Sequence, residues 1–302
     1  MLDSFVSHDG TRIRYGVWRN EQASPGGTPP ATVFLLPGRT EFIEKYSEMI
    51  AELLDRRFAV VVMDWRNQGL SDRPLANRSK HYCTDFAPAA RDLEALLKHL
   101  SAAGLPEPKY LLAHSFGGHL SLRFLHDNPG VFARAVFSAP MVDIRYAPMP
   151  AWFSRALVRI AVALGRGESY APLQRDYGKW QRGKMNMALL THDDGRFWDE
   201  HYFIDQNPDL ALGGITYGWL QAAIHSIDLI NAPGYPEKIE TPILIVQAGA
   251  DRLINNDTQA VFASRLANGS LQVIAGARHE MMKEIDEYRG AFWRGFDAFL
   301  AV

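Results

Sequence analysis

The chain has 302 residues, of which 47% are apolar and 22% charged, and 32 Lys and Arg against 34 Asp and Glu give a formal net charge of −2. These proportions are typical of an ordinary globular protein. No excess of basic residues is available to neutralise phosphates, so we expect no nucleic-acid partner. The single cysteine, Cys83, can form neither an internal disulfide nor a thiolate metal cluster, so we expect no disulfide framework and no metal.

The N-terminal residues lack a basic segment followed by an apolar run, so no signal peptide is expected. No apolar stretch approaches the roughly 18 residues that a transmembrane helix needs. The longest candidate, residues 156–164, is interrupted by Arg159. We therefore expect a cytoplasmic protein, either free or peripheral at the inner membrane surface. The sequence does not set its oligomeric state.

The first elements in chain order are two short alternating segments, residues 4–7 and 12–15, which flank Asp9 and Gly10. Alternation with a period of two on both sides of an Asp-Gly turn predicts a β-hairpin. The following stretch, residues 23–30, is rich in Pro and Gly and predicts a surface loop.

Beyond this loop, short continuous apolar runs alternate with amphipathic segments. Runs without polar alternation indicate strands buried on both faces, and their alternation with helices predicts a parallel sheet covered on both sides. The runs are residues 32–36, 58–63, 110–113, 135–137, 243–246 and 271–274, and the helical segments are 44–57, 86–102 and 116–126. Together with the hairpin, they predict an α/β fold with a mostly parallel, doubly wound sheet of about eight strands.

The alternation is interrupted between residues 141 and 231, a stretch rich in aromatic residues, Met, Arg and Gly. An insertion at the carboxyl end of a parallel sheet lies over the ligand crevice. A stretch of about 90 residues is too long for a structureless loop, so we expect it to form its own helices. The predicted organisation is a core of residues 1–140 and 233–302 with a helical cap formed by residues 141–232.

The candidate nucleophile is Ser115. Residues 110–120 contain an apolar strand, the sequence Ala-His-Ser-Phe-Gly and an apolar helix, which is the strand–turn–helix context of a nucleophile elbow. Small residues at Ala113 and Gly117 relieve the crowding around a strained serine. Ala113 stands where the motif has its first glycine, which we interpret as a tolerated change of one methyl group.

A serine needs a base, and the base needs an orienting acid. In proteins with a nucleophile elbow, the acid and then the histidine follow the serine along the chain. Asp251 follows the run 243–246, and His279 follows the run 271–274. Both therefore lie at carboxyl ends of strands, as Ser115 does. Moreover, His279 is the only histidine after Asp251.

Two other aspartates lie near these positions. Asp143 follows the run 135–137 and is a rival for the acid, whereas Asp257 is better interpreted as a helix-start residue. Some hydrolases place the acid after the earlier strand, so Asp143 stays a rival, but we favour Asp251.

An oxyanion hole needs two backbone N–H donors. We expect one from Phe116, directly after the nucleophile, and the other from Arg39 in the loop 37–41. Gly38 lets this backbone approach closely. For the Arg39 side chain two interpretations stand level: binding of a polar head group, or pairing with a nearby carboxylate such as Glu41.

These residues together resemble the α/β-hydrolases of the lysophospholipase L2 and monoacylglycerol lipase group, over nearly the whole chain. The motifs that carry the resemblance are the oxyanion loop 37–41, the D-x-R-x-x-G-x-S loop 64–71, the elbow 114–118, the acid and base turns 249–251 and 276–280, and, in the insertion, residues 190–193, 196–197, 210–214 and 216–219. The resemblance implies the α/β-hydrolase fold and hydrolysis of a fatty acyl ester through an acyl-enzyme, without a cofactor.

The expected protein is therefore a serine hydrolase that cleaves single-chain glycerolipids, similar to a lysophospholipase. Its expected partner is a small-molecule or lipid ester substrate. The alternatives are a monoacylglycerol lipase or a general carboxylesterase, followed by an acyltransferase or a non-catalytic ligand receptor. No G-x-G-x-x-G follows a strand, which gives no support to a dinucleotide cofactor.

In the insertion, Arg155, Arg159 and Arg166 are spaced by four and seven residues, which would place them on one face of a helix. A basic amphipathic helix of this kind can make a peripheral contact with an anionic membrane. The alternative, which we favour, is a solvated arginine stripe on a lid helix that packs over the pocket.

Overall fold

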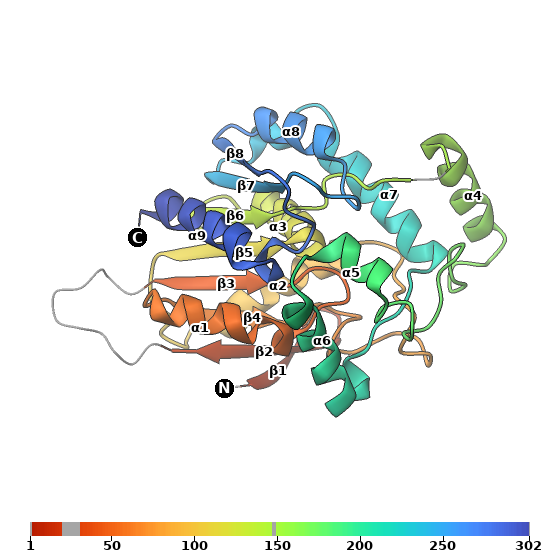
Figure 1. The fold of residues 1–302 in the computed structure, drawn as a ribbon, viewed down its shortest axis with the longest axis horizontal. Coiled ribbons are helices and arrows are strands. Elements are labelled where there is room, and N and C mark those ends of the chain that lie inside the picture. Colours follow the sequence, from red (N-terminus) through yellow and green to blue (C-terminus); the bar gives the residue numbers. More distant parts are fainter. Residues whose placement is uncertain (1, 20–30, 147–148, 302) are drawn as a thin grey trace.

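A computed structural model describes residues 2–19, 31–146 and 149–301, so the loop predicted at residues 23–30 lies outside the described residues. An eight-stranded sheet crosses the molecule in the order β1-β2-β4-β3-β5-β6-β7-β8 (Figure 1). The strands are β1 Leu2–Val6, β2 Arg12–Trp18, β3 Thr32–Leu36, β4 Ala59–Met63, β5 Lys109–His114, β6 Arg134–Ser138, β7 Ile243–Ala248 and β8 Gly269–Ile274. The predicted hairpin and all six predicted runs are therefore strands of one sheet.

The sheet is parallel except at one end. The pairs β1–β2 and β2–β4 are antiparallel, and every other neighbouring pair is parallel. The carboxyl ends of the six strands from β3 to β8 therefore meet at one edge, which we call the carboxyl edge. It lies at the right-hand end of the strands in Figure 1.

Successive side chains of a central strand enter two different cores. In β3, Phe34 and Leu36 belong to one hydrophobic cluster, whereas Val33 and Leu35 belong to the other. A strand that is buried on both faces shows a continuous apolar run, as the sequence analysis expected. The expectation is wrong for β8, where Leu271 and Val273 are exposed because β8 is the outermost strand.

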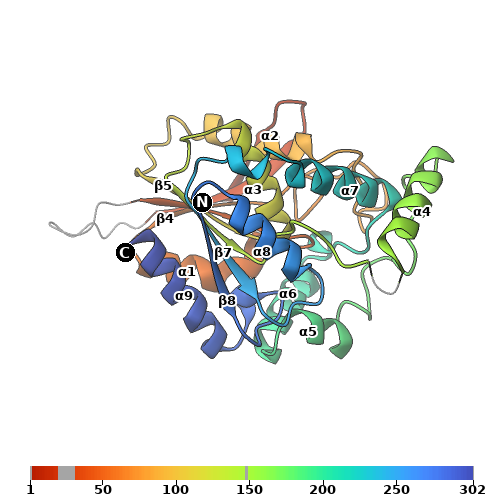
Figure 2. The same ribbon diagram turned by 90° about the horizontal axis from the view of Figure 1, so that it is seen from above.

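Helices cover both faces of the sheet (Figure 2). Residues of α2, α3, α7 and α8 contribute to the cluster on one face, and residues of α1 and α9 to the cluster on the other. The helices of these two layers are α1 Ser47–Asp55, α2 Ala87–His99, α3 Ser115–Asp127, α7 Tyr217–Asn231, α8 Asn256–Arg265 and α9 Asp286–Leu300. Short 3-10 turns are η1 Ile43–Tyr46, η2 Pro208–Leu210, η3 Pro236–Lys238 and η4 Met281–Lys283.

The insertion between β6 and β7 forms helices, as expected from its length. They are α4 Ala151–Ala163, α5 Lys184–Leu190, α6 Asp194–Gln206 and α7, and the first three lie beyond the carboxyl edge of the sheet (Figure 1). Helix α7 differs from them, because Trp219, Ala222 and Ala223 are buried in the same cluster as the sheet. The boundary of a cap at residue 232 stays a prediction, and the packing of α7 places this helix with the core. Among the described residues, no helix is both long enough and apolar enough to cross a membrane.

Candidate active site

Ser115 lies at the turn between β5 and α3, where the backbone is strained. It is the first residue of α3, directly after the last residue of β5, and its φ is 48°. This left-handed conformation costs a residue with a side chain about 1–3 kcal/mol and persists only where the surroundings impose it. The strain is the geometry of a nucleophile elbow, which holds the hydroxyl clear of the sheet.

Close packing around this turn explains the two glycines that the sequence analysis singled out. A Cβ atom on Gly117 would lie 2.6 Å from the carbonyl oxygen of Leu36 and closer still to that of Pro37. A Cβ atom on Gly38 would lie 2.8 Å from both the Glu41 carboxylate and the His114 ring. Both positions require glycine, because backbone atoms or a fixed ring occupy the space of a side chain.

The structure brings Ser115, His279 and Asp251 together in one hydrogen-bonded row. His279 Nε2 lies 2.9 Å from Ser115 Oγ, and His279 Nδ1 lies 2.7 Å from Asp251 Oδ2. An ionised carboxylate can only accept, so Nδ1 carries the proton of the neutral ring, and the Ser115 hydroxyl donates to Nε2. All three side chains are buried.

Asp251 is itself fixed by the backbone that follows it. Its Oδ1 accepts hydrogen bonds from the N–H groups of Leu253 at 2.7 Å and Ile254 at 3.0 Å. One oxygen is therefore anchored to the loop after β7, and the other is left for His279. This arrangement holds the imidazole in a single tautomer and orientation.

The two other aspartates lie outside this row. Asp143 accepts from the side chains of Asn255 at 3.1 Å and Thr258 at 3.0 Å. Asp257 lies in the first turn of α8, where its N–H donates to the capping side chain of Asn255. Neither is hydrogen-bonded to His279, so the hydrogen-bonding geometry favours Asp251 over Asp143 as the orienting carboxylate.

The surroundings of His279 favour its charged form. Burial acts against the imidazolium, but the carboxylate of Asp251, with smaller contributions from Glu280 and Glu41, outweighs burial and raises the pKa of His279 above its usual value. Burial likewise opposes ionisation of Asp251, yet His279 and the two backbone N–H groups hold the pKa of Asp251 below its usual value. The pair is suited to a base that gains and then returns a proton.

The two backbone N–H groups that we expect in the oxyanion hole have no hydrogen-bond partner among the described residues. In the loop after β3, Pro37 has no N–H, Gly38 N–H donates to the Glu41 carboxylate, and Thr40 N–H donates to Gln68 Oε1 at 3.1 Å. The N–H of Arg39, between them, finds no acceptor among the described residues. The N–H of Phe116, in the first turn of α3, is also free in this part of the chain. These are the two positions that the sequence analysis selected.

Side chains of the loop 64–71 form hydrogen bonds with the backbone of the oxyanion loop 37–41. Trp65 Nε1 donates to the carbonyl of Pro37 at 2.8 Å, and Gln68 Nε2 donates to the carbonyl of Gly38 at 2.9 Å. The buried carboxylate of Asp64 accepts hydrogen bonds from the N–H of Ile43, the first residue of η1, and from the N–H of Leu70, near the end of the loop 64–71. The backbone of the oxyanion loop is therefore held on both sides of Arg39.

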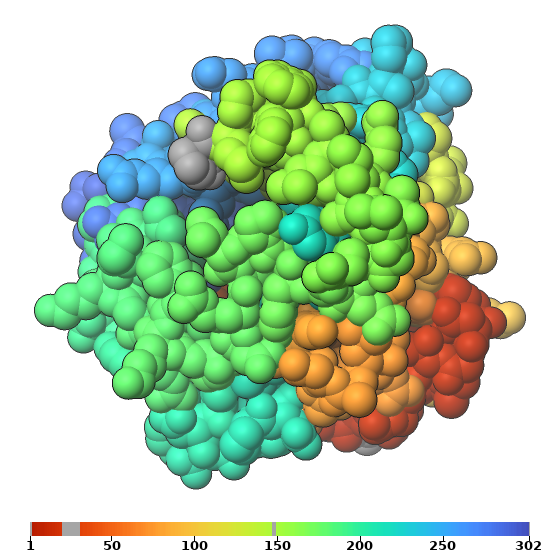
Figure 3. All heavy atoms as spheres, turned by 90° about the vertical axis from the view of Figure 1, so that its right-hand side faces the viewer, coloured from red at the N-terminus to blue at the C-terminus, as the bar shows by residue number. Residues whose placement is uncertain are grey.

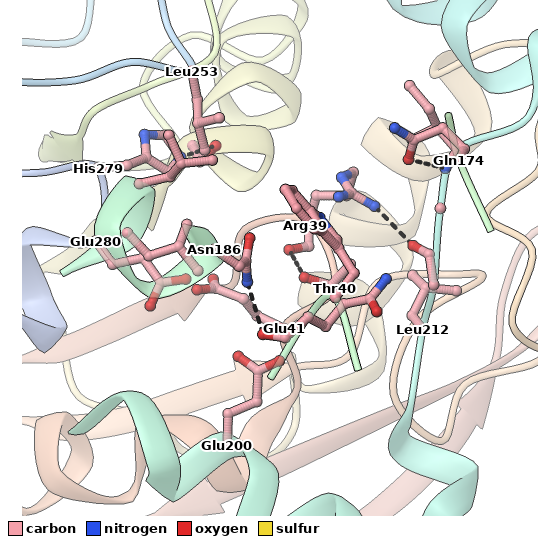
Figure 4. Close-up of a pocket in the computed structure, with 18 of the residues that line it drawn as sticks. Arg39, Thr40, Glu41, Gln174, Asn186, Glu200, Leu212, Leu253, His279 and Glu280 are labelled. Atoms are coloured by element: carbon pink, nitrogen blue, oxygen red, sulfur yellow. Dashed lines mark hydrogen bonds between the residues drawn. The ribbon is translucent and has the colours of Figure 1, made fainter. Parts of the chain in front are cut away.

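A cavity of about 440 Å³ opens over Ser115 and His279 and is closed by the insertion. Apolar side chains and polar or charged side chains both line it, and Figure 4 shows Arg39, Glu41, Glu200 and Glu280 among the charged ones. The apolar residues that line it from the insertion include Trp180, Leu190, Phe197, Leu212 and Trp219. Figure 3 looks onto this side of the molecule, where the chain between residues 150 and 190 covers much of the surface. A pocket that combines apolar side chains with charged groups suits a substrate with both a hydrocarbon chain and a polar head group.

A buried ion cluster that the sequence analysis missed joins the parts of the site. Lys45 is 2% exposed, and its Nζ lies 3.0 Å from Glu41, 2.7 Å from Glu200 and 2.8 Å from Glu280. The three carboxyl groups converge at the wall of the cavity (Figure 4). Burial opposes the charge of Lys45, but the three carboxylates outweigh it and raise the pKa of Lys45 well above its usual value. The cluster ties the oxyanion loop and the residue after the base to α6.

Only part of this cluster left a signal in the sequence. Lys45 follows Glu41 by four residues, and Glu280 adjoins the candidate base. Glu200 lies in the insertion, 155 residues from Lys45, and no local pattern points to it.

The arginine stripe that was considered for α4 is not formed. Arg155 makes an ion pair of 2.7 Å with Asp228 of α7, and Arg166 lies beyond the end of α4. Arg159 alone projects from the helix into solvent. The large side chains that α4 exposes are instead mostly apolar, among them Trp152 and Ile160.

The fold and the site define the class of protein. A mostly parallel eight-stranded sheet, a strained serine after β5 and an aspartate–histidine pair after β7 and β8 are those of an α/β-hydrolase with a serine at the nucleophile position.

Comparison with known proteins then gives the family. The family model described as serine aminopeptidase S33 matches residues 27–286. Lysophospholipase L2 of Escherichia coli (strain K12) is 31% identical over 265 residues, which cover 85% of this chain and 76% of that protein. The chain therefore belongs to the hydrolase family that the serine aminopeptidase S33 model describes. The expected fold class and the expected similarity to lysophospholipase L2 are confirmed.

More distant relatives extend the likeness. Monoglyceride lipase of Homo sapiens is 25% identical over 298 residues, which cover 95% of this chain and 86% of that protein. A solved structure of a soluble variant of monoglyceride lipase from Saccharomyces cerevisiae superposes with a TM-score of 0.74 at 18% identity, covering 99% of this chain and 94% of that one. At this identity the superposition shows the shared fold alone.

Proposed function

We propose that the protein is a serine ester hydrolase that cleaves fatty acyl esters of single-chain glycerolipids, as a lysophospholipase does. The observation that carries the proposal is the row Asp251–His279–Ser115, which ends in a cavity that apolar side chains of the insertion line in part. Similarity to lysophospholipase L2 of Escherichia coli supports the choice of substrate class.

The geometry supports the following reaction. His279 Nε2 accepts the proton of Ser115 as Oγ attacks the acyl carbonyl carbon, and the N–H groups of Arg39 and Phe116 bind the oxyanion. His279 then returns the proton to the departing alcohol, which leaves an acyl-enzyme. Water attacks the acyl group with His279 again as base, so the fatty acid leaves and the Ser115 hydroxyl is restored. Asp251 orients His279 and stabilises its charged form throughout.

A second candidate, a monoacylglycerol lipase, shares this chemistry and differs only in the head group that the cavity accepts. Similarity to the human monoglyceride lipase supports it. The two functions are separated by comparing kcat/KM for lysophosphatidylcholine and monoacylglycerol of the same acyl chain, with p-nitrophenyl butyrate as a short soluble ester. We expect lysophosphatidylcholine to be the best substrate. A preference for p-nitrophenyl butyrate would instead assign a general carboxylesterase.

The same assays on the Ser115→Ala variant test the mechanism. We expect a loss of at least about 10³-fold on every substrate with unchanged folding, because the remaining groups cannot replace the nucleophile. Ser264→Ala is the matched control. It removes an exposed hydroxyl group of α8 and should retain full activity. Substantial activity in Ser115→Ala would refute the mechanism.

We further propose that the insertion touches a lipid surface. Trp152 is 72% exposed, Ile160 58% and Leu164 73%, whereas α4 buries the smaller Ser154 and Val158. Large apolar side chains in solvent, with a tryptophan among them, are typical of segments that lie at a membrane interface. The expected cytoplasmic location stays a prediction beside this proposal.

Sedimentation with liposomes of anionic phospholipid tests this contact. We expect Trp152→Asp with Leu164→Asp to reduce the bound fraction several-fold, because charge opposes insertion into the interface. Val261→Asp is the matched control, since Val261 is 59% exposed on α8, outside the insertion. Equal binding by wild type and the double variant would exclude a contact through α4.

A further inference from the structure

The guanidinium of Arg39 is a cation in the cavity without a carboxylate partner. Its Nη1 donates to the carbonyl oxygen of Gly213 at 3.2 Å, and its central carbon lies 6.0 Å from the ring of Trp219. Among the described residues it makes no ion pair. Burial lowers the pKa of Arg39 to about 10, which leaves the side chain charged at neutral pH but poorly hydrated.

The carboxylate that the sequence offered as a partner is occupied elsewhere. Glu41 lies 3.0 Å from Lys45 and also accepts from the Gly38 N–H and the Tyr46 hydroxyl. Glu200 favours the charged form of Arg39 from beyond ion-pair distance and is bound to Lys45 at 2.7 Å. Of the two hypotheses for the Arg39 side chain, these contacts exclude the pairing with Glu41 and leave the binding of a polar head group.

The position of Arg39 relates its two ends to one substrate. Its backbone N–H is one of the two donors that we propose for the oxyanion, and the residue lines the same cavity as Ser115. In a lysophospholipid, the glycerol backbone separates the acyl ester from the phosphodiester by a length comparable to that of an arginine side chain. In a monoacylglycerol, an uncharged hydroxyl takes the place of the phosphodiester.

We propose that the Arg39 guanidinium binds the phosphodiester of a lysophospholipid head group and so selects this substrate over a neutral monoacylglycerol. A guanidinium offers several donors in one plane and binds phosphate oxygens in pairs. The phosphodiester would provide the Arg39 guanidinium with an anionic partner. Neither the reaction at the ester nor the binding of the acyl chain depends on this ion pair. The inference rests on the proposed function, since it concerns the head group of the same ester.

The test compares the ratio of kcat/KM for lauroyl lysophosphatidylcholine to that for lauroyl monoacylglycerol in the same detergent micelles. We expect Arg39→Met to lower this ratio about tenfold or more, because a charge-assisted hydrogen bond is lost for one substrate only. Arg39→Lys should retain part of the ratio through its charge. Arg91→Met is the matched control and should leave the ratio unchanged, since Arg91 is exposed on α2 and does not line the cavity.

A binding measurement separates a lipid head group from free phosphate. Glycerophosphocholine should inhibit hydrolysis of p-nitrophenyl butyrate by wild type and inhibit Arg39→Met less, whereas inorganic phosphate should inhibit both variants weakly and equally. Inhibition by inorganic phosphate as strong as that by glycerophosphocholine would overturn the assignment to a head group.

The outcomes distinguish this inference from the proposed function. An unchanged substrate ratio in Arg39→Met, or an equal loss on both substrates, overturns the role of the Arg39 side chain while leaving ester hydrolysis by Ser115 intact. A wild-type protein that hydrolyses neither lipid overturns the proposed function itself.

Discussion

The carboxyl edge of the sheet and the insertion above it are built differently. At the edge, Ser115, Asp251 and His279 are no more than 7% exposed, and each is held by hydrogen bonds of defined geometry. In the insertion, α5 buries none of its residues and α4 buries only three, while large apolar side chains lie in solvent. Proton transfer needs atoms in fixed positions, whereas a hydrocarbon chain needs only apolar surface. We infer that the chemistry is set by the core and the binding of the acyl chain largely by the insertion.

Helix α6 is where these two regions are joined. Its Glu200 binds Lys45, its Asp199 lies 3.2 Å from Lys283, and its Arg196 lies 2.8 Å from Glu48. The connection is therefore made largely by charges that only partly reach solvent. Changes at the edge, at this junction and in the insertion should have different consequences, which fall in size in that order.

At the edge, Asp251→Asn should reduce kcat by about 10⁴-fold, as the equivalent change does in serine proteases, because the imidazole loses its orienting acceptor. The base acts when neutral, so wild-type activity rises with pH through the pKa of His279, which Asp251 raises. Removing this carboxylate lowers the pKa of His279 and moves the acidic limb of the profile to lower pH. The pH dependence of kcat/KM for p-nitrophenyl butyrate measures both effects.

The rival carboxylate provides the control. Asp143→Asn should change the rate by no more than about twofold and leave the acidic limb in place, because the hydrogen bonds of Asp143 within the described part of the chain go to Asn255, Thr258 and its own loop. A larger loss in Asp143→Asn than in Asp251→Asn would reverse the assignment of the acid.

At the junction, Lys45→Met should lower the free energy of unfolding by about 3–5 kcal/mol, because the buried Glu41 and Glu280 and the partly buried Glu200 lose their common counterion. The loss should shrink as pH falls, since protonation removes the uncompensated charges. Urea denaturation at pH 7.5 and 5 measures this. Lys238→Met, an exposed lysine, should change the free energy of unfolding by less than about 0.5 kcal/mol. Equal stability of both variants would mean that the cluster does not hold the site together.

In the insertion, Trp180→Ala should have the smallest effect. Trp180 lines the cavity and is 47% exposed, so its loss removes part of the wall that contacts an acyl chain. We expect kcat/KM for lauroyl lysophosphatidylcholine to fall by about three- to tenfold, roughly 1 kcal/mol of apolar contact, with little change for p-nitrophenyl butyrate. An equal loss on both substrates would show that the insertion also shapes the chemistry.

The same two regions differ in how far the sequence predicts them. The positions of Ser115, Asp251 and His279 follow from the rule that residues after parallel strands meet at one edge, so strand runs and chain order are enough to bring them together. Gly38 and Gly117 could be selected because close backbone approach needs glycine wherever the turn occurs.

The contacts of the insertion could not be predicted, because they join residues far apart in the chain. Glu200 meets Lys45 across 155 residues, and Asp228 takes Arg155 out of the stripe that its spacing suggested. The sequence also could not predict that Glu41 pairs with Lys45 and not with Arg39, because Lys45 and Arg39 lie at similar distances from Glu41 along the chain. Helical periodicity predicts which residues share a face of α4 but not which face packs against the core. The exposure of Trp152 and Leu164 therefore could not be predicted from the sequence.

Labelling with a fluorophosphonate probe tests the central claim most directly, because such a probe reacts only with a serine that a functioning base activates. We predict that intact protein is labelled at Ser115, as located by peptide mass spectrometry, and that Ser115→Ala and His279→Ala abolish the adduct while Asp143→Asn retains it. A folded wild-type protein that stays unlabelled, or an adduct on another residue, would contradict the account.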